Sequence, residues 1–196
     1  MTALASESRA PAGSLADPQA VDRDEVALIR DAVAGDTGAF GELVHRHHGR
    51  VFNFLRQMTR HHQDAEDLTQ QTFLKAFHHL ARFDPQRPLV NWLFTIARNS
   101  ALNHFRAVKP WDELPADAAG REPSPAREAE QKEQEENLWD RARALLSPRE
   151  FEVLWLRFAE EMSTRETATV VGLTEAHVKV LVFRARQTLL KGVKSS

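Results

Sequence analysis

The sequence predicts an all-α protein: two small helical domains joined by a flexible linker, the C-terminal one a helix-turn-helix. Two observations lead to this fold class. Apolar residues recur at three- and four-residue steps on both sides of residues 109–136, and no stretch alternates as a half-buried strand would. Residues 109–136 are rich in proline and acids and hold almost no large apolar residue, so they cannot build a core.

The first half of the chain is expected to form four helices after a tail. Residues 1–25 lack an apolar period and are predicted to be disordered. Helical periodicity then runs from Val26 to Val33 and again over residues 40–55. A fourth helix is expected from Leu89 to Arg106, after a break that contains two prolines.

The third helix contains the stretch "DAEDLTQQTFLKAF", residues 64–77. Its apolar residues are expected on one broad face: Leu68, Phe73, Leu74 and Phe77. Its acids Asp64, Glu66 and Asp67 are expected in the first turn, where the positive end of the helix favours carboxylates. The polar side chains that follow, including Gln70 and Gln71, give the helix an outer face on which a protein can dock.

The fourth helix carries a polar stripe. Trp92, Asn99, Asn103 and Arg106 fall at intervals of seven, four and three residues. Residues 85–111 contain no acid, and their positive charge comes from Arg87, Arg98, Arg106 and Lys109. An indole, amides and arginines on one stripe can stack on exposed bases and hold phosphates. The alternative is an ordinary solvated face with Trp92 in the core.

The second half of the chain has strong helix signals. Periodicity returns at residues 138–146, and "SPRE" at 147–150 and "STRE" at 163–166 have the form of capping boxes. Gly172 is expected to end one helix and Thr174 to cap the last. Two helices joined by a short glycine turn, the second one basic, predict a helix-turn-helix that binds duplex DNA.

The last helix should divide into two faces. An inward apolar stripe consists of Val178, Leu181, Val182, Ala185 and Leu189. The outward residues are then Ala176, Lys179, Val180, Phe183, Arg184 and Gln187, and no acid follows Glu175. This charge suits phosphate contact, although basic residues near a helix C-terminus also complement its dipole. Val180 and Phe183 on the outer face can meet thymine methyl groups or a partner protein.

Several classes of protein find no support in the composition. The chain has no cysteine, which excludes a disulfide framework, a thiolate zinc site and a cysteine nucleophile. No apolar run approaches the length of a membrane helix, and no nucleotide-binding or hydrolase motif is present. The nine histidines lack metal-ligand spacing, so a metal-dependent enzyme is the weakest alternative. We therefore expect a cytoplasmic protein without enzymatic activity, metal or cofactor.

Three motifs in this order resemble an RNA polymerase sigma factor of the extracytoplasmic-function type. "DAEDLTQQTFLKAF" resembles the polymerase-binding helix of that family, "NWLFTIARNSALNHFR" its promoter-melting and minus-ten-reading helix, and "LSPREFEVLWLRF…GLTEAHVKVLVFRARQTLL" its minus-thirty-five domain. The resemblance implies a region 2 domain at residues 26–108 and a region 4 domain at residues 137–194. It also implies binding to core RNA polymerase, through the β′ clamp helices and the β flap, and to promoter DNA. Whether an anti-sigma factor also binds is left open.

The resemblance assigns roles to individual residues. Polymerase binding would fall to Asp64, Asp67, Gln70 and Gln71. The minus-ten element would be contacted by Phe83, Arg87, Trp92, Asn99, Asn103 and Arg106. The minus-thirty-five element would be contacted by Thr174, His177, Lys179, Val180, Phe183 and Arg184.

The chain departs from the family pattern at four of its positions. The family usually has an acid where Gln71 stands and often an aspartate where Asn103 stands. In the last helix, Val180 and Leu181 replace a serine and an arginine that are common there. The promoter sequence therefore cannot be transferred from the family.

Two further interpretations compete with this one. A LuxR-type regulator explains the last sixty or so residues, but not the motifs of the first half. An adaptor or decoy that kept the fold and lost promoter activity is compatible with the altered last helix. The low net charge, formally −2, fits a sigma factor, which takes most of its DNA affinity from the polymerase.

Overall fold

The computed structural model describes residues 23–108 and 138–194, and these residues contain helices and no β-strand. In the first half, the helices are α1 (Arg23–Val33), α2 (Thr37–Thr59), α3 (His62–His79) and α4 (Leu89–Val108), with a 3₁₀ turn at Leu80–Arg82. The second half has helical residues 138–145, then α6 (Pro148–Leu154) with a π-helical extension (Trp155–Ala159), α7 (Thr164–Val171) and α8 (Glu175–Lys194). The predicted all-α fold is confirmed. The predicted linker and nearly all of the predicted tail lie outside the described residues.

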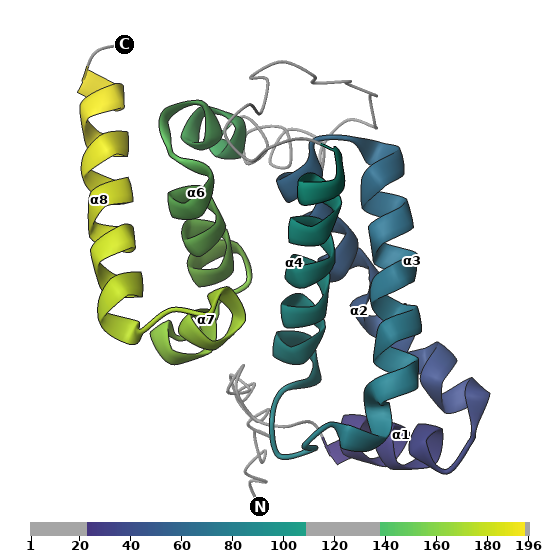
Figure 1. The fold of residues 1–196 in the computed structure, drawn as a ribbon. Coiled ribbons are helices and arrows are strands. Elements are labelled where there is room, and N and C mark those ends of the chain that lie inside the picture. The colour runs from purple at the N-terminus through teal and green to yellow at the C-terminus, as the bar shows by residue number, and fades with distance from the viewer. Residues whose placement is uncertain (1–22, 109–137, 195–196) are drawn as a thin grey trace, which may run out of the picture.

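The first domain packs α2, α3 and α4 around one core, with α1 against α2 (Figure 1). At its centre Phe54 of α2 meets Phe94 of α4 edge to face, with ring centroids 5.0 Å apart. Two buried threonines of α3 also belong to the core, because their hydroxyls donate to carbonyls four residues earlier: Thr69 to Ala65 at 2.6 Å and Thr72 to Leu68 at 2.7 Å. A polar side chain satisfied in this way costs little to bury.

The apolar face predicted for α3 is wrong in part. Leu68 and Phe73 are buried, but Leu74 is 61% exposed and Phe77 is 43% exposed. Because the threonines take positions on the inward side, the buried stripe is displaced and Leu74 is left on the solvent side. The expectation that apolar residues alone mark the core face failed here.

Two helix starts differ from expectation. α3 begins at His62, because the ring of His61 accepts a hydrogen bond from the backbone N–H of Asp64 at 3.3 Å and caps the helix. Of the three acids expected in the first turn, only Asp64 lies there. α1 begins at Arg23, before the expected start at Val26, and its Glu25 lies 2.7 Å from the buried ring of His47.

The second domain follows the sequence signals closely. Both predicted capping boxes are formed, at Ser147 with Glu150 and at Ser163 with Glu166. Gly172 ends α7 in the left-handed conformation, with φ 66°, and the hydroxyl of Thr174 accepts from the N–H of His177 at 3.3 Å. α7 and α8 therefore form the predicted helix-turn-helix.

The two domains lie against each other. In Figure 1, α4 lies between α3 on one side and α6 and α7 on the other, and α4 contacts α7 directly. The sequence did not predict this arrangement.

Candidate nucleic-acid interfaces

The polar stripe of α4 is formed on the surface of the first domain. Asn99, Asn103 and Arg106 are exposed, and the guanidinium of Arg106 donates to the amide oxygen of Asn103 at 3.1 Å. Trp92 is half-buried and packs on Phe83 with ring centroids 5.0 Å apart. Trp92 therefore lies partly in the core, as the second interpretation of the stripe expects, and the exposed amides and arginine remain available for the nucleic-acid contacts that the first interpretation predicts.

Asp84, which the sequence analysis did not single out, orders the loop before α4. The carboxylate of Asp84 accepts from the N–H of Gln86 at 3.0 Å and lies 3.4 Å from the exposed guanidinium of Arg87. The Asp84 carbonyl accepts from the N–H of Arg87 at 3.1 Å. This turn fixes where Phe83 and Arg87 stand relative to α4.

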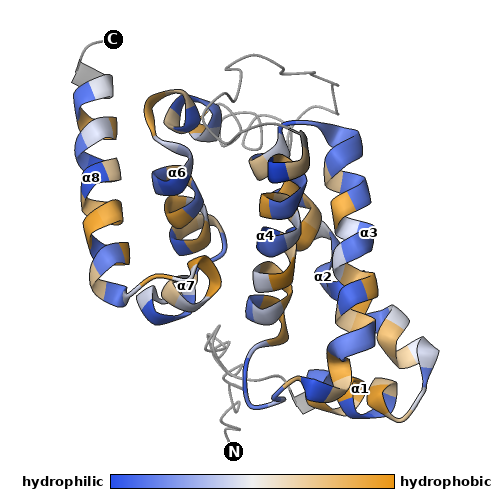
Figure 2. Ribbon diagram, in the orientation of Figure 1, coloured by the Kyte–Doolittle hydropathy of each residue, from blue (hydrophilic) through white to orange (hydrophobic). Residues whose placement is uncertain are grey.

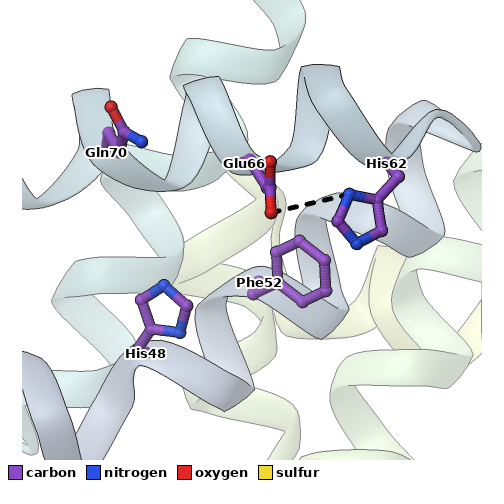
Figure 3. A pocket seen from close by; sticks show the side chains of 5 residues that line it. All are labelled: His48, Phe52, His62, Glu66 and Gln70. Carbon is purple, nitrogen blue, oxygen red and sulfur yellow. Dashed lines mark ion pairs between the residues drawn. The ribbon is translucent and has the colours of Figure 1, made fainter.

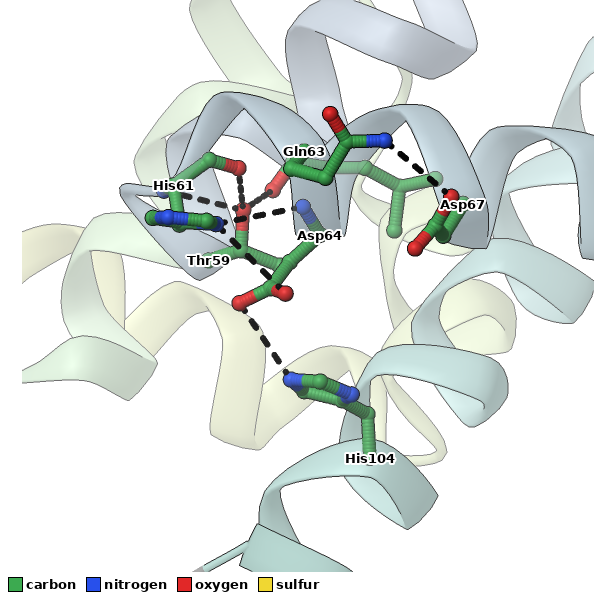
Figure 4. A network of polar contacts seen from close by, with 7 residues as sticks. Thr59, His61, Gln63, Asp64, Asp67 and His104 are labelled. Atoms are coloured by element: carbon green, nitrogen blue, oxygen red, sulfur yellow. Dashed lines mark hydrogen bonds and ion pairs between the residues drawn. The ribbon is translucent and has the colours of Figure 1, made fainter.

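The start of α3 holds the residues expected at the polymerase. Asp67, Gln70 and Gln71 are exposed, and Asp64 is half-buried. The side-chain amide of Gln63 donates to Asp67 at 3.5 Å (Figure 4). All four side chains belong to α3, but they do not share one side of it: Asp64 faces His104 of α4, and Gln70 borders the groove toward α2.

Asp64 is shared between two histidines (Figure 4). Its two oxygens lie 3.5 Å from Nδ1 of His61 and 3.5 Å from Nε2 of His104. His104 is a residue of α4, next to Asn103, so this carboxylate joins the start of α3 to the end of the polar stripe. The sequence did not predict this contact of His104. The only signal for a role of His104 was its position next to Asn103 in the fourth helix.

A shallow groove of about 310 Å³ runs beside Gln70, between α2 and α3 (Figure 3). Its walls are His48, Phe52, His62, Glu66 and Gln70. Nδ1 of His62 lies 3.6 Å from Glu66, and the ring of His48 stacks on Phe52. In residues 23–108 and 138–194, no group of three His, Cys, Asp or Glu side chains is placed to hold a metal ion.

The last helix has the two faces that its sequence predicts. Val178 and Ala185 are buried, and Leu181, Val182 and Leu189 pack against the core. The outward residues Lys179, Val180, Phe183 and Arg184 are all exposed, as are Thr174 and His177 at the start of the helix. Leu181 points inward, so of the two positions that depart from the family pattern in this helix, only Val180 lies on the outward face.

A buried ion pair joins the two domains. Nε of Arg98 in α4 lies 2.5 Å from a carboxylate oxygen of Glu152 in α6, and both side chains are 8% exposed. Burial raises the pKa of Glu152, and the charge and hydrogen bond of Arg98 oppose that rise. The sequence analysis counted Arg98 among the positive charges of residues 85–111. In the arrangement seen here, which we call the closed form, the second domain covers Arg98 and its charge is not available on the surface.

Three further polar contacts cross between the domains. The side-chain amide of Asn91 donates to Glu166 at 2.6 Å, Arg50 pairs with Glu160 at 2.9 Å, and Arg143 donates to the backbone carbonyl of Gln57. Each contact joins the first domain to the second.

Arg143 is poorly compensated at this interface. Burial, followed by repulsion from Arg60, lowers the pKa of Arg143 to about 10, so it stays charged at neutral pH. Its guanidinium stacks over Phe151 at 4.2 Å, while two of its nitrogens have no hydrogen-bond partner among the residues that the structure describes. An interface built on buried charges is weakly stabilising, because desolvation offsets most of the attraction.

Comparison with known families matches both domains. Sigma-70 region 2 matches residues 43–109, and Sigma-70 region 4 matches residues 137–189. The match in the first half contradicts the LuxR-type interpretation, which accounted only for the end of the chain. None of the helices in the described part of the chain is long and apolar enough to cross a membrane.

Similar proteins cover most of the chain. The ECF RNA polymerase sigma factor SigM of Bacillus subtilis is 32% identical over 144 residues, which cover 71% of this chain and 85% of SigM. BldN of Streptomyces coelicolor, also an ECF sigma factor, is 34% identical over 169 residues; these are 84% of this chain and 64% of BldN, so the chain spans less than two thirds of BldN. The structure of CnrH in complex with the cytosolic domain of CnrY superposes with a TM-score of 0.66 and 27% identity, covering 88% of this chain and 99% of CnrH.

Proposed function

Since the chain belongs to the extracytoplasmic-function group of the sigma-70 RNA polymerase sigma factors, we propose a division of labour between its exposed faces. A sigma factor binds core RNA polymerase and directs promoter-specific initiation. In this chain α3 binds the β′ clamp helices through Asp64, Asp67, Gln70 and Gln71, and region 4 meets the β flap. The α4 stripe opens and reads the minus-ten element, and α8 reads the minus-thirty-five element. The chain itself catalyses no reaction and acts in the cytoplasm with the polymerase.

One observation carries this proposal: both family matches fall on domains that present a face suited to nucleic acid. The α4 stripe combines amides with an arginine, which suits bases and phosphates of an opened strand. The outward face of α8 is cationic and follows a helix-turn-helix, which suits a duplex. The decoy interpretation gives no reason for two such faces in one chain.

The test is promoter-directed transcription by core polymerase with and without the full-length chain. Specific transcripts that need the chain are expected. If the chain binds the polymerase and no specific start site appears in a genomic library of promoters, the decoy interpretation replaces this one.

The domains must separate for both elements to be read. The two elements are centred about 25 base pairs apart, or about 85 Å at about 3.4 Å per base pair. A compact body of this chain length has a radius of gyration of about 16 Å, so the arrangement with α4 against α7 cannot span that distance. The closed form is therefore a state of the free protein that opens on the polymerase.

Control by an anti-sigma factor fits this picture. CnrH was solved with the cytosolic domain of CnrY, and a second similar structure, with TM-score 0.63 and 25% identity, is RpoE of Bartonella quintana with the anti-sigma factor NepR. We propose that this chain also has an anti-sigma partner. Two exposed apolar side chains of α3, Leu74 and Phe77, are available for contact with such a partner.

Replacing both Lys179 and Arg184 by alanine should weaken promoter binding by the holoenzyme. Each cation that meets a phosphate contributes about 0.9 to the slope of log affinity against log salt, so the slope should fall by about 2. Affinity is measured at several salt concentrations on a duplex promoter. Arg165→Ala, an exposed change on α7, is the matched control. An unchanged slope in the double variant would remove α8 as the phosphate-binding helix.

Asn99→Ala should impair strand opening more than polymerase binding. Asn99 is exposed on the α4 stripe and supports no core contact, so its loss removes hydrogen bonds to an opened base. Permanganate reactivity of promoter thymines is expected to drop while co-elution with polymerase is kept. Wild-type reactivity in the variant would count against the minus-ten role of the stripe.

A further inference from the structure

The outward face of α8 is apolar along its middle. Val180 is 46% exposed and Phe183 is 64% exposed, although both are side chains that usually lie inside. They are three residues apart and thus neighbours on the helix surface, with exposed Ala176 one turn before Val180. Figure 2 shows orange, apolar turns among the blue ones of α8. This row is separate from the buried stripe of Val178 and Ala185.

Among residues 23–108 and 138–194, the packing does not use this row. The described contacts between the domains come from α2 and α4 of the first domain and from residues 138–145, α6, Glu160 and α7 of the second, and the apolar contacts of α8 with its own domain come from its other face. Val180 and Phe183 therefore remain uncovered even in the closed arrangement.

The charge around the row indicates what covers it. Exposed Lys179 and Arg184 flank Val180 and Phe183, and no acid follows Glu175 along the rest of the chain. An apolar row with cations on its flanks complements a surface that is itself apolar in the middle and anionic at the edges. The major groove has this pattern where thymine C5 methyl groups lie between two phosphate backbones.

We propose that Val180 and Phe183 read thymine methyl groups in the major groove of the minus-thirty-five element. This inference rests on the proposed function, in which α8 enters that groove. Lys179 and Arg184 then hold phosphates and carry no sequence information, because phosphate contacts position a protein without reading bases. Sequence selection by this helix comes from methyl contacts in place of hydrogen bonds from polar side chains.

The experiment replaces thymine by deoxyuridine, which removes only the C5 methyl group. The minus-thirty-five site is first selected by the holoenzyme, core polymerase with the full-length chain, from promoters randomised in that element. Each selected thymine is then changed to deoxyuridine in turn. At thymines that meet Val180 or Phe183 we expect an affinity loss of about fourfold, the effect of losing one buried methyl-sized group.

Variants of the protein assign the contacts. Val180→Ala and Phe183→Ala should each lose the penalty at one thymine position, so that thymine and deoxyuridine bind alike there, and both should keep the wild-type salt slope. Both side chains are exposed, so neither change opens a cavity in the core. Lys179→Ala is the matched control: it should keep the deoxyuridine penalty and reduce the salt slope by about 1.

Three outcomes of the DNA-binding measurements would overturn the proposal. They are a selected site without thymine, equal binding of thymine and deoxyuridine at every position, and a penalty that persists in both alanine variants. Loss of polymerase binding in Phe183→Ala would assign the row to a protein contact and would also overturn it. All these results leave promoter-directed binding by the wild-type holoenzyme intact, whereas failure of that binding would instead contradict the proposed function.

Discussion

Replacing Glu152 by alanine is expected to part the two domains of the free protein. The change removes one member of a buried pair and leaves the guanidinium of Arg98 without a partner at a site that is 8% exposed. Breaking such a pair costs about 3–5 kcal/mol. Opening relieves that cost, because Arg98 then regains water. The balance between closed and open forms should shift by about two to four powers of ten toward the open form.

The measurement is energy transfer between dyes on two introduced cysteines. The chain has no cysteine of its own, so Asn53→Cys in α2 and Thr169→Cys in α7, both exposed sites, label one domain each. Lower transfer is expected in Glu152→Ala than in the protein with Glu152 intact. Equal transfer in the two proteins would show that the ion pair does not hold the domains together.

A second variant tests the same interface in the opposite direction. Arg98→Met combined with Glu152→Leu replaces the pair by apolar side chains of similar volume, which is often neutral or stabilising by about 1–4 kcal/mol. High energy transfer should be kept, and association with core polymerase should slow, because opening now exposes apolar surface. Faster association in the double variant would contradict the view that the closed form must open first.

Asp67→Arg is expected to abolish co-elution of the chain with core RNA polymerase. Asp67 is exposed on α3, and within the described part of the chain its side chain is held only by the long hydrogen bond from the amide of Gln63, so the change should leave the fold unaffected. If the polymerase surface that binds the Asp67 carboxylate is positively charged, an arginine at this position is repelled by it, and juxtaposed like charges at an interface cost several kcal/mol. Loss of the attraction adds to this cost.

The control for this change is Glu42→Arg on α2. Glu42 is also an exposed acid in a helix, and its partner is Arg46, at 2.9 Å on the same helix. It should co-elute as the wild type does. If Asp67→Arg also co-eluted unchanged, α3 would not be the polymerase-binding helix, and the acids at its start would have only a capping role.

Local signals in the sequence predicted much of this structure. The two capping boxes, the stop at Gly172 and the two faces of α8 depend on residues a few positions apart, and all were formed as expected. The same holds for the exposed amides of α4, whose placement follows from helical spacing alone.

The features that escaped prediction depend on distant partners. Glu25 meets His47, and Arg98 meets Glu152 across 54 positions, so neither pair leaves a pattern within one helix. The displaced face of α3 was missed for another reason. Thr69 and Thr72 are polar by composition, yet their hydroxyls are satisfied by their own helix and the side chains are buried.

The ion pair between α4 and α6 also limits how such proteins can be recombined. A chimera that joins residues 23–108 of this chain to the second domain of a relative inherits Arg98 without a guarantee of Glu152. If the incoming domain has an apolar residue at the position of Glu152, Arg98 stays unpaired and the chimera should favour the extended state. If it has an acid there, the compact state should be kept. Two chimeras can thus differ in the fraction of free protein that is in the compact state, depending on the residue at a single position of the incoming domain.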